Sequence, residues 1–357
     1  MDLEGPEVLD SRWYVEEVSS LRGCAIEWIS PGKAIISRGS ELLHGDSLDG
    51  PFSTIGTIPL SRWQHPLSRN RFARRFLRLM YFNVSPLKNN RYFATFDKTI
   101  GIFDNSQFIP ISTNNRFRVL RQGTAQLSNS LFLGEYFNNP QRQSVRVFRI
   151  DVDSTTPRLQ TAYVFPQRHI RHIHRIQLDP YTSDLWCMTG DLPKECFILK
   201  TSDQFDTIDV VGGGDETWRC ISPVFLKDHI YYATDSEYHQ NSIYRIDRQT
   251  GSRELICHID GPVYYSTRLE EHIFFAVTAE LCPSQYSGHA SLWHLSTNDQ
   301  SSPKNILRVP KDSLSVKWFL PGTLYFPTTI DEQTNVYWGG FGLSGSDYRV
   351  FCLKQKS

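Results

Sequence analysis

The sequence predicts an all-β protein folded as a seven-bladed β-propeller. β-rich runs come in groups of four along nearly the whole chain, and nowhere do long helices alternate with strands. In the middle of the chain, four apolar runs each end in a carboxylate, roughly 45 to 55 residues apart, which is the length of one four-stranded blade with its loops. These runs are Leu131–Glu135, Leu185–Asp191, Ile230–Asp235 and Ile273–Glu280.

Seven groups of strand-forming residues, separated by turn residues, define the predicted blades. They cover residues 24–59, 79–111, 117–165, 172–211, 218–259, 263–309 and 315–353. The last group offers four runs: Val316–Leu320, Thr323–Pro327, Asn335–Trp338 and Tyr348–Leu353. The whole chain, 1–357, is expected to form a single propeller domain.

Two segments fall outside the regular pattern. Between residues 62 and 78, Leu67, Phe72 and Phe76 recur at helix-like spacing among arginines, which predicts a short helical insertion. Arg12–Val18 is a candidate closing strand. A six-bladed ring is the alternative, if the first and last groups share one blade.

The charge balance argues against a partner that would be attracted by a large net charge of the protein. Lys plus Arg and Asp plus Glu both number 38, so neither nucleic acid nor a membrane is the expected partner. The arginines between Arg62 and Arg78 favour a solvated helix face over a nucleic-acid patch. Seven scattered cysteines without a CxxC spacing argue against a disulfide framework or a zinc site.

The chain start, Met1–Pro6, lacks a secretory signal pattern, and no apolar run approaches membrane-spanning length. A cytoplasmic protein is therefore expected, and its oligomeric state is open.

Blade geometry turns the strand pattern into a site prediction. The second strand of a blade ends at the rim where the first strand begins, so residues from both positions should converge. Second-strand ends supply Glu135, Asp191, Asp235 and Glu280, with Asp97 and Thr328 at equivalent places. First-strand beginnings supply Arg118, Arg171, His172, His174, Arg219 and Tyr265. Acids, bases and a phenol at one opening are what a polar ligand or acid/base chemistry requires.

The predicted catalytic residues are His172, His174, Asp191 and Glu135. His172 and His174 stand two apart on a strand and point the same way, so one can act as a general base oriented by its neighbour or by Asp191. The pair could equally bind a divalent cation, or His174 could be a structural histidine. The acids could bind a cation through oxygen, or simply cap loops.

The predicted substrate-binding residues are Arg219, Tyr136, Asp235, Tyr265, Glu280 and Arg171. The planar guanidinium of Arg219 suits a substrate carboxylate, the alternative being an ion pair with Asp191 or Asp235. Tyr136, Tyr264 and Tyr265 could stack on a sugar ring or pack in the core.

Three segments carry a family resemblance. Gly134–Asn139 with Arg142, His172–Asp191 and Asp235–Gly251 resemble bacterial sialidase-like propellers with BNR repeats, over about residues 116–283. The Asp-box turn of these proteins is matched only in degenerate form, at residues 201–207 and 151–156, which lack its Gly and Trp. The resemblance implies a propeller with a polar axial pocket of a kind often used on carbohydrates.

Two functions stay open. The first is an enzyme acting on a small polar substrate, a sugar or uronate, either by hydrolysis with two acids or by elimination with His172 as the base and Arg219 on the carboxylate. The second is a non-catalytic propeller that binds a glycan or a protein through an exposed apolar patch.

Overall fold

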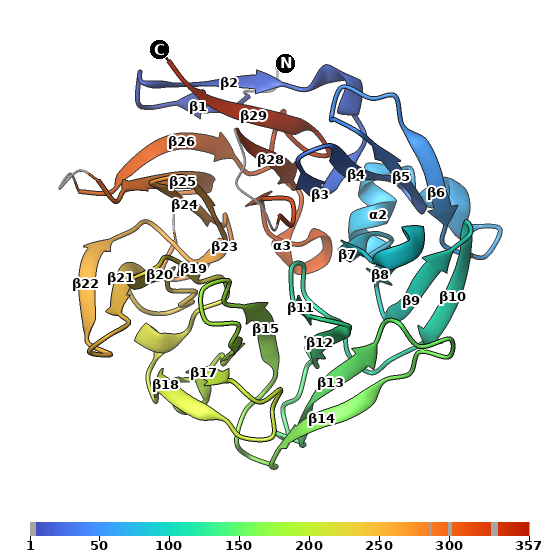
Figure 1. Ribbon diagram of the computed structural model, residues 1–357. Coiled ribbons are helices and arrows are strands. Elements are labelled where there is room, and N and C mark those ends of the chain that lie inside the picture. The colour runs from blue at the N-terminus through green and yellow to red at the C-terminus, as the bar shows by residue number, and fades with distance from the viewer. Residues whose placement is uncertain (1–4, 286, 299–301, 330–334, 357) are drawn as a thin grey trace. The chain divides into compact units, whose positions relative to one another are not determined.

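The computed structural model describes residues 5–285, 287–298, 302–329 and 335–356. It is all-β, with a seven-bladed β-propeller arrangement of seven antiparallel sheets, which confirms the predicted fold class (Figure 1). The α-helices of the described residues are short: Gln64–Leu67 (α1), Arg71–Leu77 (α2) and Val316–Phe319 (α3). The predicted helical insertion therefore corresponds to α1 and α2. Within the described chain, no helix has the length and apolar character needed to span a bilayer.

The chain forms two compact units. The first unit contains Met1–Met80, Glu237–Ile243 and Ile256–Ser357, and the second contains Tyr81–Ser236 and Tyr244–Leu255. The fifth blade contributes residues to both units, because its strands β21 (Ser242–Asp247) and β22 (Arg253–His258) cross the division. The two units are described separately below.

The first unit holds the first, sixth and seventh blades. The first blade is β3 (Ala25–Ser30), β4 (Lys33–Arg38), β5 (Glu41–Gly45) and β6 (Ser53–Thr57). The sixth is β23 (Val263–Leu269), β24 (His272–Val277), β25 (His289–Ser296) and β26 (Lys304–Pro310), to which β1 (Glu7–Val8) adds a fifth strand. The seventh is β27 (Thr323–Tyr325), β28 (Val336–Phe341), β29 (Val350–Gln355) and β2 (Trp13–Glu17).

The seventh blade combines strands from distant parts of the sequence. β2 pairs with β29 in antiparallel register, with Trp13 opposite Gln355, so the predicted closing strand is confirmed. The ring nevertheless has seven blades, because the first blade already has four strands of its own.

The expectation that Val316–Leu320 begins the seventh blade was wrong. This run forms α3, and the innermost strand is β27, so Thr328 does not end a second strand. A five-residue run that is mostly apolar is compatible with either a strand or a helical turn. Here a tertiary contact accompanies the helix: Arg75 Nε of α2 donates a hydrogen bond to the carbonyl oxygen of Phe319 at 2.9 Å.

The second unit holds the second, third and fourth blades and most of the fifth. In chain order, its strands are β7 (Tyr81–Pro86), β8 (Tyr92–Phe96), β9 (Thr99–Asp104), β10 (Gln107–Ser112), β11 (Thr124–Leu127), β12 (Ser130–Gly134), β13 (Val145–Asp151), β14 (Gln160–Phe165), β15 (Ile173–Leu178), β16 (Leu185–Thr189), β17 (Phe197–Thr201), β18 (Asp209–Gly213), β19 (Val224–Phe225) and β20 (His229–Ala233). Each blade pairs successive strands in antiparallel order.

The core of the second unit lies between neighbouring blades. Phe132 of β12 packs in one buried cluster with Ile176, Cys187 and Leu199 of the fourth blade. Ile176, Cys187 and Leu199 come from the innermost, second and third strands of that blade. Side chains alternate between the two faces of a sheet, so one face of this blade packs against Phe132. This packing fixes the strand ends that carry the candidate site.

Candidate active site

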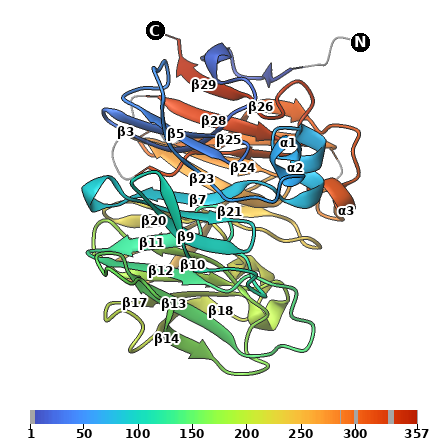
Figure 2. The same ribbon diagram turned by 90° about the vertical axis from the view of Figure 1, so that its right-hand side faces the viewer.

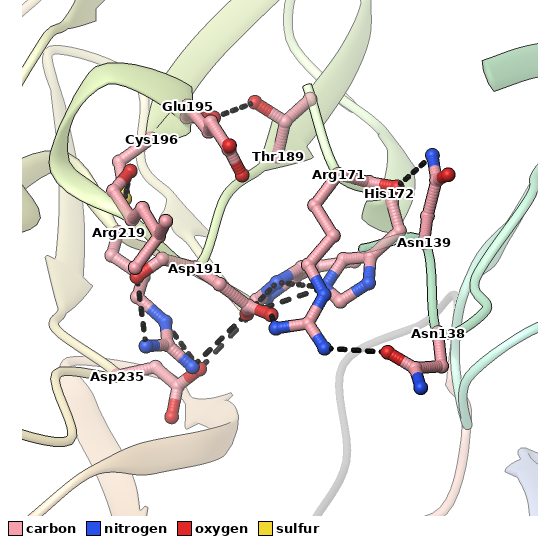
Figure 3. Close-up of polar contacts among 12 residues, drawn as sticks. Asn138, Asn139, Arg171, His172, Thr189, Asp191, Glu195, Cys196, Arg219 and Asp235 are labelled. Atoms are coloured by element: carbon pink, nitrogen blue, oxygen red, sulfur yellow. Dashed lines mark hydrogen bonds and ion pairs between the residues drawn. The ribbon is translucent and has the colours of Figure 1, made fainter. Parts of the chain in front are cut away.

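The candidate site lies in the second unit, where β15 begins and β16 ends. His172 and His174 come from the start of β15, Asp191 follows β16, and Asp235 follows β20. Figure 3 shows His172, Asp191 and Asp235 close together. Arg171 and Arg219 stand just before the innermost strands of the fourth and fifth blades. These six side chains therefore lie close together, at strand ends that were expected from the sequence to share one rim.

A β-bulge places His174. Ile173 pairs with Thr189 and Arg175 pairs with Met188, so His174 is an extra residue without an opposite partner in β16. Such a bulge bends a strand and redirects a side chain. It brings the Nε2 atom of His174 to 3.0 Å from Nε2 of His172.

The tautomer of His172 follows from its other ring nitrogen. Nδ1 lies 3.2 Å from the carbonyl oxygen of Phe137, which only accepts hydrogen bonds, so Nδ1 carries the proton. In the neutral ring, Nε2 therefore presents a lone pair. This lone pair faces Asp191 Oδ1 at 3.2 Å and the His174 ring.

Asp191 is the centre of the cluster. Its Oδ1 lies 3.3 Å from His174 Nε2 and 3.2 Å from an Arg219 nitrogen, and its Oδ2 accepts a hydrogen bond from Arg171 at 2.7 Å. Burial disfavours its charge, but its close contacts with the imidazoles of His172 and His174 outweigh burial and hold its pKa well below the usual range. Asp191 is therefore ionised at neutral pH.

Arg219 joins two carboxylates. Its Nε donates to Asp235 Oδ2 at 3.1 Å, and its other nitrogens contact the backbone oxygen and the carboxylate of Asp191. Asp235 is almost fully buried, and its Oδ2 lies 3.9 Å from Nδ1 of His174. Arg219 is therefore ion-paired with both Asp191 and Asp235, which was the alternative to its binding a substrate carboxylate.

Burial controls the protonation of the remaining groups. It lowers the pKa of His174 to about 4, so this imidazole is neutral at pH 7. The half-buried Tyr136 has its ring centroid 4.1 Å from that of His172. Burial, reinforced by Asp191 and Asp235, raises the pKa of Tyr136 above its usual value, so its phenol keeps its proton.

Two glycines allow the close approaches that assemble the site. A Cβ on Gly134, at the end of β12, would lie 2.4 Å from Cγ2 of Ile173, so only glycine lets β15 start beside Tyr136. Gly190 has a φ of +148°, and its Cβ would lie 3.0 Å from Sγ of Cys196. Gly190 therefore sets the position of the Asp191 that follows it.

The other predicted acids have different surroundings. Both oxygens of Glu135 accept hydrogen bonds from Arg116, and Oε2 also accepts from the backbone N–H of Arg146. This carboxylate is buried and bound to its own blade, and no contact joins it to His172 or Asp191 among the interactions of the described residues. Glu280 belongs to the first unit, where it accepts a hydrogen bond from Tyr264 at 2.6 Å. Tyr265 also belongs to the first unit.

The sequence did not reveal the residues that hold Arg171. Asn138 Oδ1 accepts a hydrogen bond from Arg171 at 2.9 Å, and Asn139 Nδ2 donates to its backbone oxygen at 3.0 Å (Figure 3). The adjacent asparagines after Tyr136 were a visible signal, because Asn commonly bonds to backbone groups in loops.

The donor set and its geometry fit a metal ion. The three atoms His172 Nε2, His174 Nε2 and Asp191 Oδ1 lie 3.0 to 3.3 Å apart. Ligands at metal–ligand distances of about 2.1 Å around a tetrahedral or octahedral centre lie roughly 3 to 3.5 Å apart. Two imidazoles and a carboxylate suit a divalent transition metal, and a carbonyl on the far nitrogen of a ligating histidine is a common support.

No protein-family model and no curated protein match this chain. Among solved structures, an oligogalacturonate lyase from Vibrio parahaemolyticus is similar at a TM-score of 0.63 and 10% identity, over 99% of this chain and 97% of that chain. An oligogalacturonate lyase in complex with manganese is similar at 0.57 and 10%, over 100% and 99%. A chain of a mitotic checkpoint complex is similar at 0.56 and 10%, over 100% and 98%. These likenesses show the fold.

The sialidase-like resemblance stays a sequence prediction. One of its Asp-box traces has a clear structural role: Asp203, between β17 and β18, accepts hydrogen bonds from Thr201 Oγ1 and from the backbone N–H and hydroxyl of Thr207. Asp203 thus closes the turn between the third and fourth strands of its blade.

Proposed function

We propose that the protein is an enzyme that acts on a uronate-type carbohydrate by elimination, at the cluster centred on Asp191. The observation that carries this proposal is the position of His172 Nε2. The Phe137 carbonyl holds the proton on the other ring nitrogen, so Nε2 presents a lone pair beside two arginines and an ionised carboxylate. An imidazole base beside a carboxylate-binding cation is what proton removal next to a carboxylate requires.

Arg171 takes the role of binding the substrate carboxylate. Its side chain is 31% exposed, whereas that of Arg219 is 11% exposed and engaged by both Asp191 and Asp235. Asn138 and Asp191 hold the Arg171 guanidinium from two sides, so its orientation is fixed before a ligand arrives.

The proton balance of the step uses two residues. His172 Nε2 accepts the proton from the carbon beside the carboxylate, and the released electron pair forms a C=C bond as the glycosidic oxygen leaves. Tyr136, whose phenol stays protonated, donates a proton to that oxygen. Its ring lies against His172, so donor and acceptor are neighbours.

Elimination fits the site better than hydrolysis by two acids. That hydrolysis needs one protonated carboxyl group and one ionised group. Asp191 is held ionised by its hydrogen bonds, and Asp235 is ion-paired with Arg219. The names of the two similar lyases support the proposal of a uronate substrate.

The same cluster would hold a divalent cation through His172 Nε2, His174 Nε2 and Asp191 Oδ1. When bound, such an ion supplies positive charge for the substrate carboxylate, and His172 is then a ligand instead of the proton acceptor. The manganese complex of one similar lyase supports testing this ion.

The test is turnover of oligogalacturonate by the purified protein, followed through the ultraviolet absorbance of the unsaturated product. We expect His172→Ala to lose this activity by about 10²-fold or more with the fold retained. Glu135→Gln is the matched control, because this buried carboxylate is outside the cluster and its loss should lower stability more than turnover.

Three outcomes contradict the proposal. New reducing ends without absorbance would indicate hydrolysis, and equal turnover by His172→Ala would remove this base. Tight glycan binding by the folded protein without any turnover would favour a non-catalytic propeller.

A further inference from the structure

An exposed group of aromatic and basic side chains lies on the helices of the first unit. Phe72 and Phe76 of α2 and Trp318 of α3 are 42%, 51% and 55% exposed. Arg71 and Lys317, both exposed, come from the same two helices. These five residues are called the aromatic–basic patch below.

The patch is continuous across α2 and α3, which lie side by side in Figure 2. Phe72 and Phe76 are four residues apart and share one face of α2. The ring of Phe76 lies 6.2 Å from Trp318 and 5.8 Å from Phe319, centroid to centroid. Apolar side chains from two segments far apart in sequence therefore form one surface.

Buried ionic contacts hold the two helices together beneath the patch. Arg75 is fully buried, donates to the backbone oxygen of Phe319, and pairs with Asp312. Its Nη1 also lies 3.6 Å from Oδ2 of Asp347. This network holds α2 against α3, so the exposed aromatic side chains of the two helices belong to one surface.

The surroundings of the patch are cationic although the whole protein is neutral. No Asp or Glu occurs in the sequence between Asp49 and Asp97, and α3 has none either. The guanidinium of Arg71 lies 4.6 Å from the ring centroid of Phe72, and the ammonium of Lys317 lies 5.5 Å from that of Trp318. The acids of this network, Asp312 and Asp347, both lie beside the buried Arg75, and Asp312 also pairs with Lys311.

We propose that the aromatic–basic patch docks on the surface of an anionic lipid bilayer. Amphipathic aromatic rings are favoured at the interface between water and lipid, and flanking Lys and Arg are attracted to acidic headgroups. The charge complementarity is local, so it is compatible with equal numbers of acids and bases in the whole chain.

Two other occupants fit the patch less well. Bases of a single-stranded nucleic acid need open ring faces, but cations already lie over the faces of Phe72 and Trp318. A specific protein partner needs roughly 800 Å² on each side, which three aromatic side chains cannot supply. A bilayer surface needs no matching shape.

The test is sedimentation of the full-length protein with vesicles of equal parts phosphatidylcholine and phosphatidylserine, compared with vesicles of phosphatidylcholine alone. We expect binding to the mixed vesicles only, weakening as salt is added. Phe76→Ser with Trp318→Ser should lower the affinity at least tenfold. Arg71→Glu and Lys317→Glu should each lower it about fivefold or more.

Matched controls separate the patch from general surface effects. Val210→Ser removes an apolar side chain that is 64% exposed in the second unit, and Lys227→Glu reverses an exposed charge there. Both should bind like the unaltered protein, and all variants should unfold at similar temperatures.

The proposal is overturned by an absence of binding to the mixed vesicles, by equal binding to both vesicles, or by equal losses in the control variants. If a single-stranded oligonucleotide bound the protein and competed with the vesicles, the partner of the patch would be a nucleic acid instead of a lipid surface.

Discussion

The Nε2 atoms of His172 and His174 lie 3.0 Å apart in a buried position, and Oδ1 of Asp191 faces both. His172 Nε2 carries a lone pair, because its proton is on Nδ1. Acceptors this close need a hydrogen atom or a cation between them, either the Nε2–H of a neutral His174 or a bound metal ion. The chemistry of the site depends on which of the two is present.

Metal binding distinguishes these two states. We expect the chelator-treated protein to bind one Mn²⁺ or Zn²⁺ per chain in calorimetric titration, and His174→Ala to weaken this binding by at least tenfold. His229→Ala is the control, because this half-exposed imidazole lies outside the cluster, where it contacts Asp247 and the ring of Tyr231. Absence of binding would show that a hydrogen atom, not a metal ion, lies among these acceptors, and unchanged affinity in His174→Ala would exclude His174 as a ligand.

Because the pKa of His174 is low, we expect the metal-free protein to lose stability in acid. The folded pKa is about 4, whereas an unfolded histidine titrates near 6.5. Between these values, the unfolded chain binds a proton that the folded chain does not, so the free energy of unfolding falls as the pH drops from about 6.5 to 4, by on the order of 3 kcal/mol. Denaturant titrations across this range check the slope.

His174→Gln gives the corresponding control for this pH dependence. Glutamine has no ionisable group, so the variant should lose most of the slope between pH 6.5 and 4. A variant with the same slope as the unaltered protein would assign the effect to another group.

Gly190→Ala should displace Asp191. The added Cβ would meet Sγ of Cys196, and the φ of +148° is costly for alanine. We expect a loss of stability of about 1 to 3 kcal/mol and a loss of turnover larger than this destabilisation explains. Gly214→Ala is a suitable comparison, because its φ is also positive but its Cβ would meet nothing within 4 Å. Equal turnover in the two variants would contradict this role.

Arg219→Ala should cost far more stability than the loss of a surface arginine. Its removal leaves Asp191 and Asp235 facing each other without the cation that joins them, and breaking such a buried pair costs about 3 to 5 kcal/mol. Arg245→Ala breaks an exposed pair with Glu254 and should cost less than about 1 kcal/mol. Chemical denaturation of both variants measures the difference, and similar costs would refute the bridging role.

The sequence was most informative where strand topology decides position. The alternation of His172 and His174 and the carboxylate after each second strand were enough to bring Asp191, Asp235 and Arg219 together, because blade geometry joins these strand ends at one rim. No long-range knowledge was needed for this inference.

Side-chain direction could not be inferred in the same way. Glu135 follows its strand as Asp191 does, yet it turns to Arg116 and to a backbone N–H of its own blade. Arg219 was expected to bind substrate, whereas Arg171 is the more exposed of the two. These outcomes depend on contacts between residues whose pairing leaves no pattern in the sequence.

Short apolar runs were the other limit. Val316–Leu320 has strand-like composition but forms α3, where Phe319 accepts a hydrogen bond from a helix encoded more than two hundred residues earlier. The bulge at His174 was also invisible, because an extra residue in a strand changes the pairing but not the composition.

The pairing of β2 with β29 also determines when folding can finish. During synthesis, β2 leaves the ribosome long before its partner β29, because all the other strands of the seven blades lie between them in the sequence, apart from β1. The seventh blade is therefore completed only after the strands of the other six blades have been synthesised, and each of the two strands has an edge open to other chains until they pair. Deleting Trp13–Glu17 would make this temporary exposure of β29 permanent.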